Sequence, residues 1–366
     1  MGNKPTTPEA FDLKEKERSI VAKYPLAITT IDASTLKNDD TKVVFNKLVK
    51  GDLNDETALL LCDVEEYEDQ DVPMFVATKL DLDEFKARLK KEMENAAAEG
   101  QPIKNVILYV HGINCQPLSS FETARKMTEA MKKDGVLVIP VMWPAQDKGI
   151  YTKDRKINAP GAAKALATLC EEIASRELPI SLLCWSCGNF VLREFASQLN
   201  TSSSRLKFQH IFMSAPDVAA NTFETDDGPK IVNLVEEKVH VLHCKRDIAL
   251  FTWKVPAVYS CLGRPNESGL GLRGFDEEKV QSTIDMKKLV NVDANQFDMD
   301  ILGPITNPNR LWSTTSRNLG NEKNELLFGT SYLQIYVLFF TKVFYCTPTC
   351  LPQLPLGLLL VPVPHG

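Results

Sequence analysis

The central part of the chain alternates short apolar runs with longer segments in which apolar residues recur every three or four positions. Apolar runs occupy Asn105 to Val110, Val136 to Trp143 and Ile180 to Trp185. Runs without alternating polar residues are typical of strands buried on both faces of a sheet. Helical spacing follows, as from Ser120 to Lys133. This alternation predicts an α/β fold, with a mostly parallel sheet and helices on both faces. Further strands are expected over Phe208 to Ser214, Lys238 to Cys244 and Val280 to Ile284.

Residues 1–100 follow a less regular pattern. Two strands are predicted, from Glu56 to Cys62 and from Pro73 to Thr78. The acidic run between them, Asp63 to Asp71, is most simply a solvated loop. An amphipathic helix is predicted from Asp81 to Ala98. About 60 ordered residues would make a marginal core alone, so we expect this N-terminal extension to add early strands to the main sheet.

Charge is distributed unevenly along the chain. The totals are 42 Lys+Arg and 48 Asp+Glu, a net charge of −6, which leaves no positive surplus for phosphates and argues against a nucleic-acid partner. Between Leu326 and Gly366 the only charged side chain is Lys342. We therefore expect the main domain to occupy residues 101–325, followed by an apolar, proline-containing tail at 326–366.

The tail leaves two explanations open. Its apolar stretches are shorter than the roughly 20 residues that span a bilayer, but it could anchor the chain peripherally. Gly2 lies in a Met-Gly-x-x-x-Thr pattern for myristoylation, which would supply a second membrane signal. Alternatively, the tail is foreign to the domain. No secretory signal is evident and the nine cysteines are irregularly spaced, so we expect a cytoplasmic protein, either free or peripheral at a membrane.

Candidate chemistry falls at the carboxyl ends of predicted strands, where open α/β sheets place their sites. His111 and Gly112 follow one strand, Ser186 follows another and Asp247 a third. A serine on a tight strand-to-helix turn presents its hydroxyl as a nucleophile. The amide of Cys187, at the start of the next helix, can hold an oxyanion. Taken alone, the serine could instead be an ordinary helix cap.

The remaining parts of such a site are assigned from position in the chain. The second oxyanion amide is expected from the loop after the first strand, at Ile113. Asp247 is the favoured acid for orienting a histidine. Asp217 is a second candidate acid, although an aspartate there more often caps a following helical turn.

Together, these motifs resemble those of an uncharacterised family of α/β-hydrolases that is abundant in bacteria. The shared features are a His-Gly-x-Asn segment, a Trp-Pro, a Ser-x-Gly-Asn elbow, an Ala-Pro-Asp, a basic-x-Asp acid site and a Gly-Leu-rich loop. They lie here at residues 111–114, 143–144, 186–189, 215–217, 245–247 and 268–274. The resemblance implies an α/β-hydrolase fold and hydrolysis of esters or similar acyl compounds, without a metal or organic cofactor.

The expected base is the main departure from this family. The resemblance places a histidine in a Gly-His-Ser-Tyr segment, and the nearest match has Thr330 at that position. Threonine cannot act as a base at neutral pH, and a serine hydroxyl needs one. His111 belongs to its loop, and a strand would place His243 beside Asp247 rather than over Ser186. The triad is therefore expected to be incomplete.

Three hypotheses of function follow. The first is a serine hydrolase that acts on an ester or related acyl bond of a small substrate. The second is a non-catalytic binding protein with a hydrolase fold, held at a membrane or free. The third, ranked below both, is a redox protein that uses the Cys-x-x-Cys of Cys184 and Cys187.

Overall fold

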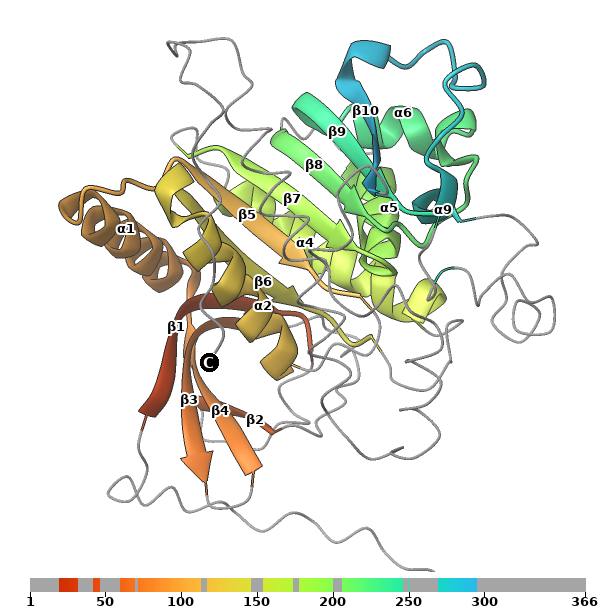
Figure 1. The fold of residues 1–366 in the computed structure, drawn as a ribbon. Helices are drawn as coiled ribbons and strands as arrows, with labels where there is room; N and C mark the ends of the chain where they lie inside the picture. Colours follow the sequence, from red (N-terminus) through yellow and green to blue (C-terminus); the bar gives the residue numbers. More distant parts are fainter. Residues whose placement is uncertain are drawn as a thin grey trace, which may run out of the picture.

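Ten strands pair into one sheet in the order β10-β9-β8-β7-β5-β6-β1-β3-β4-β2 (Figure 1). The structure is a computed structural model and describes residues 20–31, 42–46, 60–69, 72–112, 117–145, 154–173, 178–199, 206–245, 250 and 269–294.

Seven neighbouring strands of this sheet run parallel. Every residue of β5 and β6 is buried, as expected for strands covered on both faces. The sequence predicted the central strands closely, because their apolar runs are continuous. In sheet order the parallel strands are β10 (Leu289–Asp293), β9 (Val235–His243), β8 (Phe208–Ser214), β7 (Ile180–Trp185), β5 (Asn105–Val110), β6 (Val136–Met142) and β1 (Ile20–Thr29).

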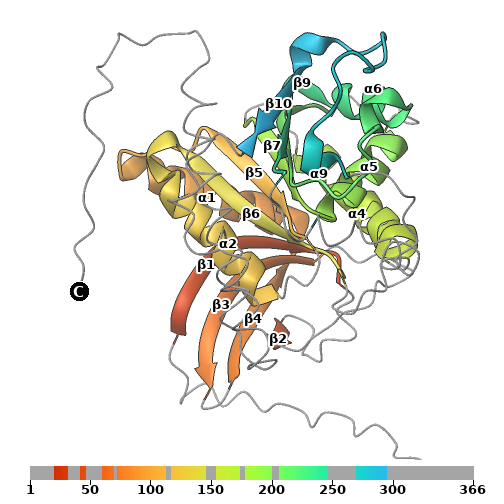
Figure 2. The same ribbon diagram turned by 45° about the vertical axis from the view of Figure 1, so that its right-hand side comes forward.

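Helices cover both faces of the parallel sheet (Figures 1 and 2). Ala124, Met127 and Met131 place α2 (Pro117–Ala130) and the turn after it on one apolar core. The other face packs against α1 (Leu82–Ala98), α4 (Ala159–Ile173), α5 (Gly188–Leu199) and α6 (Asp227–Val232). This arrangement confirms the predicted α/β-hydrolase fold. In the part of the chain that the structure describes, no helix is both long and apolar enough to cross a membrane.

Short helical segments complete the described structure. Most of them lie in the connections between strands. They are η2 (Lys132–Asp134), the π-helical η3 (Asp154–Asn158), η4 (Thr222–Glu224), α9 (Leu270–Arg273) and η5 (Met286–Lys288).

Local sequence signals explain where several of these elements begin and end. Asp81 accepts a hydrogen bond from the Glu84 amide at 2.8 Å, and the Glu84 carboxylate accepts one from the Asp81 amide at 2.9 Å. This capping box starts α1 where the amphipathic pattern predicted a helix. Gly135 adopts φ 72°, a left-handed conformation, and ends η2 directly before β6.

The N-terminal strand β1 pairs in parallel with β6, and beyond it β3 (Leu60–Asp69), β4 (Val72–Leu80) and β2 (Lys42–Asn46) extend the sheet in antiparallel pairs. The prediction of a solvated loop over the acidic run was wrong, because residues up to Asp69 pair with β4 and many also pair with β1. An antiparallel sheet can leave one face to water, so acidic residues do not prevent strand pairing. β1 and β2 were not predicted. The predicted division at residues 100 and 325 stays a prediction.

A strand expected from Val280 to Ile284 is also absent, since these residues form turns and the strand comes later, as β10.

The order of the strands reverses at β5, and this determines where a site can form. From β5 the chain crosses to β6 on one side, and then to β7 on the other side of β5. The connections therefore leave the carboxyl ends of β5 and β7 in opposite directions, and open α/β sheets place their ligand sites at such a reversal. His111 follows β5 and Ser186 follows β7, so the candidate motifs lie at this reversal.

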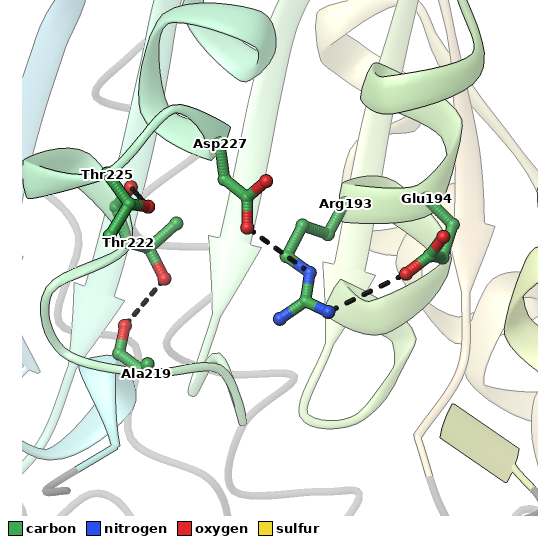
Figure 3. A network of polar contacts seen from close by, with 6 residues as sticks. All are labelled: Arg193, Glu194, Ala219, Thr222, Thr225 and Asp227. Carbon is green, nitrogen blue, oxygen red and sulfur yellow. Dashed lines mark hydrogen bonds and ion pairs between the residues drawn. The ribbon is translucent and has the colours of Figure 1, made fainter. Parts of the chain in front are cut away.

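On the surface of the helical layer, α6 is joined to α5 by ion pairing. Arg193 of α5 lies 3.4 Å from Asp227 of α6 and 3.6 Å from its neighbour Glu194 (Figure 3). All three side chains are partly exposed, so the pairs contribute little, about 0–1 kcal/mol.

Candidate active site

Ser186 occupies a strained turn between β7 and α5. Its φ of 51° lies in the left-handed region, which a residue with a Cβ rarely adopts. Within the described residues, Ala215, with φ 40°, is the one other non-glycine residue with a positive φ. Strain of this kind persists only where the surrounding structure enforces it, and it concentrates at functional sites.

Two glycines let neighbouring backbone approach this turn. A Cβ on Gly188 would lie 2.6 Å from the Val110 oxygen and 2.8 Å from the His111 oxygen. A Cβ on Gly112 would lie 3.1 Å from the Ser186 Cβ. The start of α5 therefore packs directly on the end of β5, and the loop after β5 lies against the serine.

The backbone of Ser186 is held from two sides. Its amide donates to the Ser214 oxygen at 2.9 Å, and its own oxygen accepts from the Asp217 amide at 3.2 Å. The side-chain amide of Asn189 donates to the oxygens of Ser186, at 2.9 Å, and Cys184, at 3.0 Å. Asn189 thus closes the turn. The elbow motif contained this asparagine, but its role was not evident without the geometry.

His111 is fully engaged by its own loop. Its Nδ1 donates to the Gly112 oxygen at 2.7 Å, and its Nε2 accepts from the Trp143 amide at 3.2 Å. The Trp143 indole donates to the His111 oxygen at 2.9 Å. Burial lowers the pKa of His111 to about 4, so the imidazole is neutral at pH 7. His111 therefore fixes the loop and has no nitrogen left to act as a base.

The Cys-x-x-Cys residues are buried, and neither forms a disulfide. Cys184 is the penultimate residue of β7, and Cys187 lies between Ser186 and the first residue of α5. Burial raises the pKa of Cys184 and keeps it protonated. Because only a thiolate is reactive, this environment weighs against the redox hypothesis.

The three other histidines of the described residues belong to the sheet. Nδ1 of His210 on β8 and Nε2 of His240 on β9 lie 3.4 Å apart. Burial lowers the pKa of His210 to about 4 and that of His240 to about 3. His243 ends β9 opposite Asp293 of β10, and its pKa is lowered mainly by burial. His210 lies near the start of β8, away from the carboxyl end of β7 that Ser186 follows, and β8 separates His240 and His243 on β9 from that strand. The sheet therefore places none of the three beside Ser186.

Of the two candidate acids, Asp217 lies within the described residues and Asp247 does not. Asp217 is 2% exposed and lies three residues after the end of β8, and its amide donates to the Ser186 oxygen. The next helical turn, η4, begins after Asn221, so Asp217 does not cap it. Asp247, Ile113, Thr330 and Gly2 lie outside the described residues, and their roles stay predictions.

Within the described residues, no group of three or more His, Cys, Asp or Glu side chains is arranged to hold a metal ion.

Comparison with known proteins identifies the family. A family model described as "alpha/beta hydrolase of unknown function (DUF900)" matches residues 82–300, from α1 past β10. A search of curated proteins found no match. The match covers more than half of the 366 residues and all of the elements around Ser186. The chain therefore belongs to this family of α/β-hydrolases of unknown function.

Proposed function

We propose that the chain is a serine hydrolase that cleaves an ester or related acyl bond of a small substrate. The observation that supports this most is the strained turn at Ser186, which follows β7 beside the point where the strand order reverses. A turn of this kind exposes a hydroxyl above the sheet at the start of a helix. An ordinary helix cap does not require a positive φ, since capping residues adopt extended conformations.

In the proposed reaction, the Ser186 oxygen attacks the carbonyl carbon of the substrate while its proton passes to a base. The resulting oxyanion accepts hydrogen bonds from the amides of Cys187 and Ile113, and the amide at the start of α5 benefits from the helix dipole. Collapse expels the alcohol, which takes up a proton, and leaves an acyl-enzyme. Water then releases the acid. Asp247, or Asp217 in second place, would orient the base.

A fluorophosphonate probe tests this proposal, because such probes modify only activated serines. The intact chain should be labelled, and Ser186→Ala should remove the labelling. Ser197→Ala, on the same side of the sheet in α5, is the matched control and should leave labelling unchanged. Labelling that survives in Ser186→Ala would show that another residue reacts.

A second candidate function is retained, because in the described residues no histidine is bonded to the serine. In this alternative the chain binds its ligand without turnover. An intact, folded chain that the probe does not label would favour binding over hydrolysis.

The missing base has its own test. If residue 330 occupies the position of the family's histidine, Thr330→His should raise the rate of labelling at Ser186, by about 10²- to 10⁴-fold for a working general base. Thr330→Gln, which cannot take a proton, is the control. Equal labelling rates in the two variants would exclude position 330 as the site of the base.

A further inference from the structure

One sequence motif has no part in the proposed reaction: the Gly-Leu-rich loop, of which the structure describes Gly269 onward. Its residues Leu270 to Leu272, here called the α9 strap, bond to the segments that leave β8 and β9. The Leu270 amide donates to the Val218 oxygen at 2.8 Å, and the Gly271 amide donates to the Pro216 oxygen at 2.9 Å. In return, the Gly271 oxygen accepts from the Cys244 amide at 2.8 Å. The strap thus ties two strand ends together.

Gly271 touches the backbone of the segment after β8. A Cβ at this position would lie 2.5 Å from the Ala215 carbonyl carbon and 2.7 Å from the Pro216 nitrogen. Real Cβ atoms do not approach backbone so closely, so only glycine fits without moving the chain. The residue against which it packs, Ala215, is the second strained residue, with φ 40°. A left-handed conformation of alanine needs outside support, and the strap is in position to give it.

The segment that the strap supports is the one that holds Ser186. Ser214, directly before Ala215, accepts the hydrogen bond from the Ser186 amide. Asp217, two residues after Ala215, donates its amide to the Ser186 oxygen. Both backbone groups of the serine are therefore bonded to residues that flank the contact with Gly271.

Side-chain packing adds a second connection between the strap and the serine. Leu272 packs with Ala215 and Leu250 in a small buried cluster, and Trp185, directly before Ser186, packs against it. Movement of the strap would therefore reach the serine through both backbone and side chains.

We propose that the α9 strap is a positioning element for the nucleophile, and that Gly271 is its key residue. Because Gly271 packs against Ala215 and Pro216, it fixes the positions of Ser214 and Asp217. These two residues in turn fix the conformation of the serine turn. The consequence for reaction rate rests on the proposed function, whereas the consequence for the turn itself does not.

Three glycine-to-alanine variants of the full chain test the proposal. Gly271→Ala should displace the segment after β8. Gly269→Ala is the permissive control, because its Cβ would have no neighbour closer than 3.8 Å and its φ is −64°. Gly228→Ala in α6 is the matched damaging control, because its Cβ would lie 2.7 Å from the Phe223 Cα, away from the serine turn.

The first readout is hydrogen exchange at the amides of Ser186 and Asp217. In Gly271→Ala we expect exchange at both to be at least about tenfold faster, since their hydrogen bonds depend on the displaced segment. Gly269→Ala should match the intact chain. Gly228→Ala should show no faster exchange there than its overall loss of stability explains. Equal exchange in Gly271→Ala and Gly228→Ala would overturn the proposal.

The second readout is the rate of fluorophosphonate labelling per folded molecule. A misplacement of about 1 Å can cost roughly 10²-fold in rate, so Gly271→Ala should be slowed at least about tenfold. If Gly271→Ala accelerates hydrogen exchange at Ser186 and Asp217 but the intact chain is never labelled, the positioning role of the strap is supported and the hydrolase proposal fails. If labelling requires Ser186 but Gly271→Ala changes neither hydrogen exchange nor the labelling rate, the positioning role of the strap is contradicted and the hydrolase proposal is not.

Ala215→Gly keeps the proposal testable if Gly271→Ala does not fold. Glycine tolerates the left-handed conformation, so this variant removes the strain but leaves the bonds of the strap intact. If the strap holds the turn, exchange at Ser186 stays within about twofold of the intact chain. A tenfold acceleration would show that Ala215 itself holds the turn, and would overturn the role of the strap.

Discussion

Trp143 donates two hydrogen bonds to His111, one from its amide to the imidazole and one from its indole to the carbonyl oxygen, and these join the end of β6 to the end of β5. The His-Gly and Trp-Pro motifs are separated in the sequence, yet they form one structural unit. The sequence indicated that His111 belongs to its loop, but it could not show that Trp143 is the partner. That depends on β5 and β6 being neighbours in the sheet.

Trp143→Phe should lower the free energy of unfolding by about 1–3 kcal/mol, because the buried His111 oxygen loses its donor. Urea unfolding at pH 7 measures this change. A loss below about 0.5 kcal/mol would mean that water or a neighbouring group replaces the indole.

Ser186 illustrates how far reasoning from single residues extends. Its place after an apolar run predicted a strand-to-helix turn, and the structure confirms that turn. Three features of Ser186 depend on the folded chain: its positive φ, its hydrogen bond from the Asn189 side chain and its contact with Gly112.

Among the elements, the contact between α5 and β5 positions the serine most directly. The two meet at Gly188, whose missing side chain brings the start of the helix onto the oxygens of Val110 and His111. The same oxygen of His111 accepts the indole of Trp143, so the helix, the loop and β6 converge there.

Gly188→Ala should therefore destabilise the chain, although alanine is favoured over glycine in a helix by about 1 kcal/mol. The new Cβ would lie 2.6 Å from backbone, and overpacking of this kind costs typically 1–3 kcal/mol. We expect the clash to dominate and the unfolding midpoint to fall. Ser197→Ala, later in the same helix and only partly buried, should change stability by less than about 0.5 kcal/mol. A Gly188→Ala variant as stable as this control would contradict the close approach.

The strands of the N-terminal extension show where element prediction failed. Acidic residues within β3 suggested a loop, since charge is usually excluded from the buried strands around which the other predictions were built. Pairing with β1 and β4 stabilises this strand through its backbone, and the pattern of side chains does not reveal that pairing.

At the scale of the whole molecule, the described residues include four histidines that are buried in the parallel part of the fold: His111, His210, His240 and His243. Burial lowers the pKa values of the first three to about 4, about 4 and about 3, against 6.5 for an exposed imidazole, and it also lowers the pKa of His243. As the pH falls below 6.5, the unfolded chain takes up protons at these residues and the folded chain does not. The stability that these neutral histidines contribute is therefore present in full above about pH 6.5 and is lost as the pH falls toward their folded-state pKa values of about 4 to about 3.

For His111 alone, the loss between pH 7 and pH 4 should be about 3 kcal/mol. Urea unfolding at a series of pH values measures the total. His240→Phe removes one of these groups and should reduce the slope between pH 7 and pH 5. A stability that does not change over this range would mean that the imidazoles are hydrated or charged in the folded chain.

The sequence alone determined the central strands, the helices between them and the positions of Ser186, Asp217 and the glycine-rich motifs along the chain. These follow from local periodicity and turn chemistry, which act over a few residues. The tertiary structure alone decided which motifs meet: His111 with Trp143, Gly112 with Ser186, and Gly271 with Ala215. Those contacts depend on strand order and on close backbone approach between distant segments, neither of which is encoded in the spacing of apolar residues.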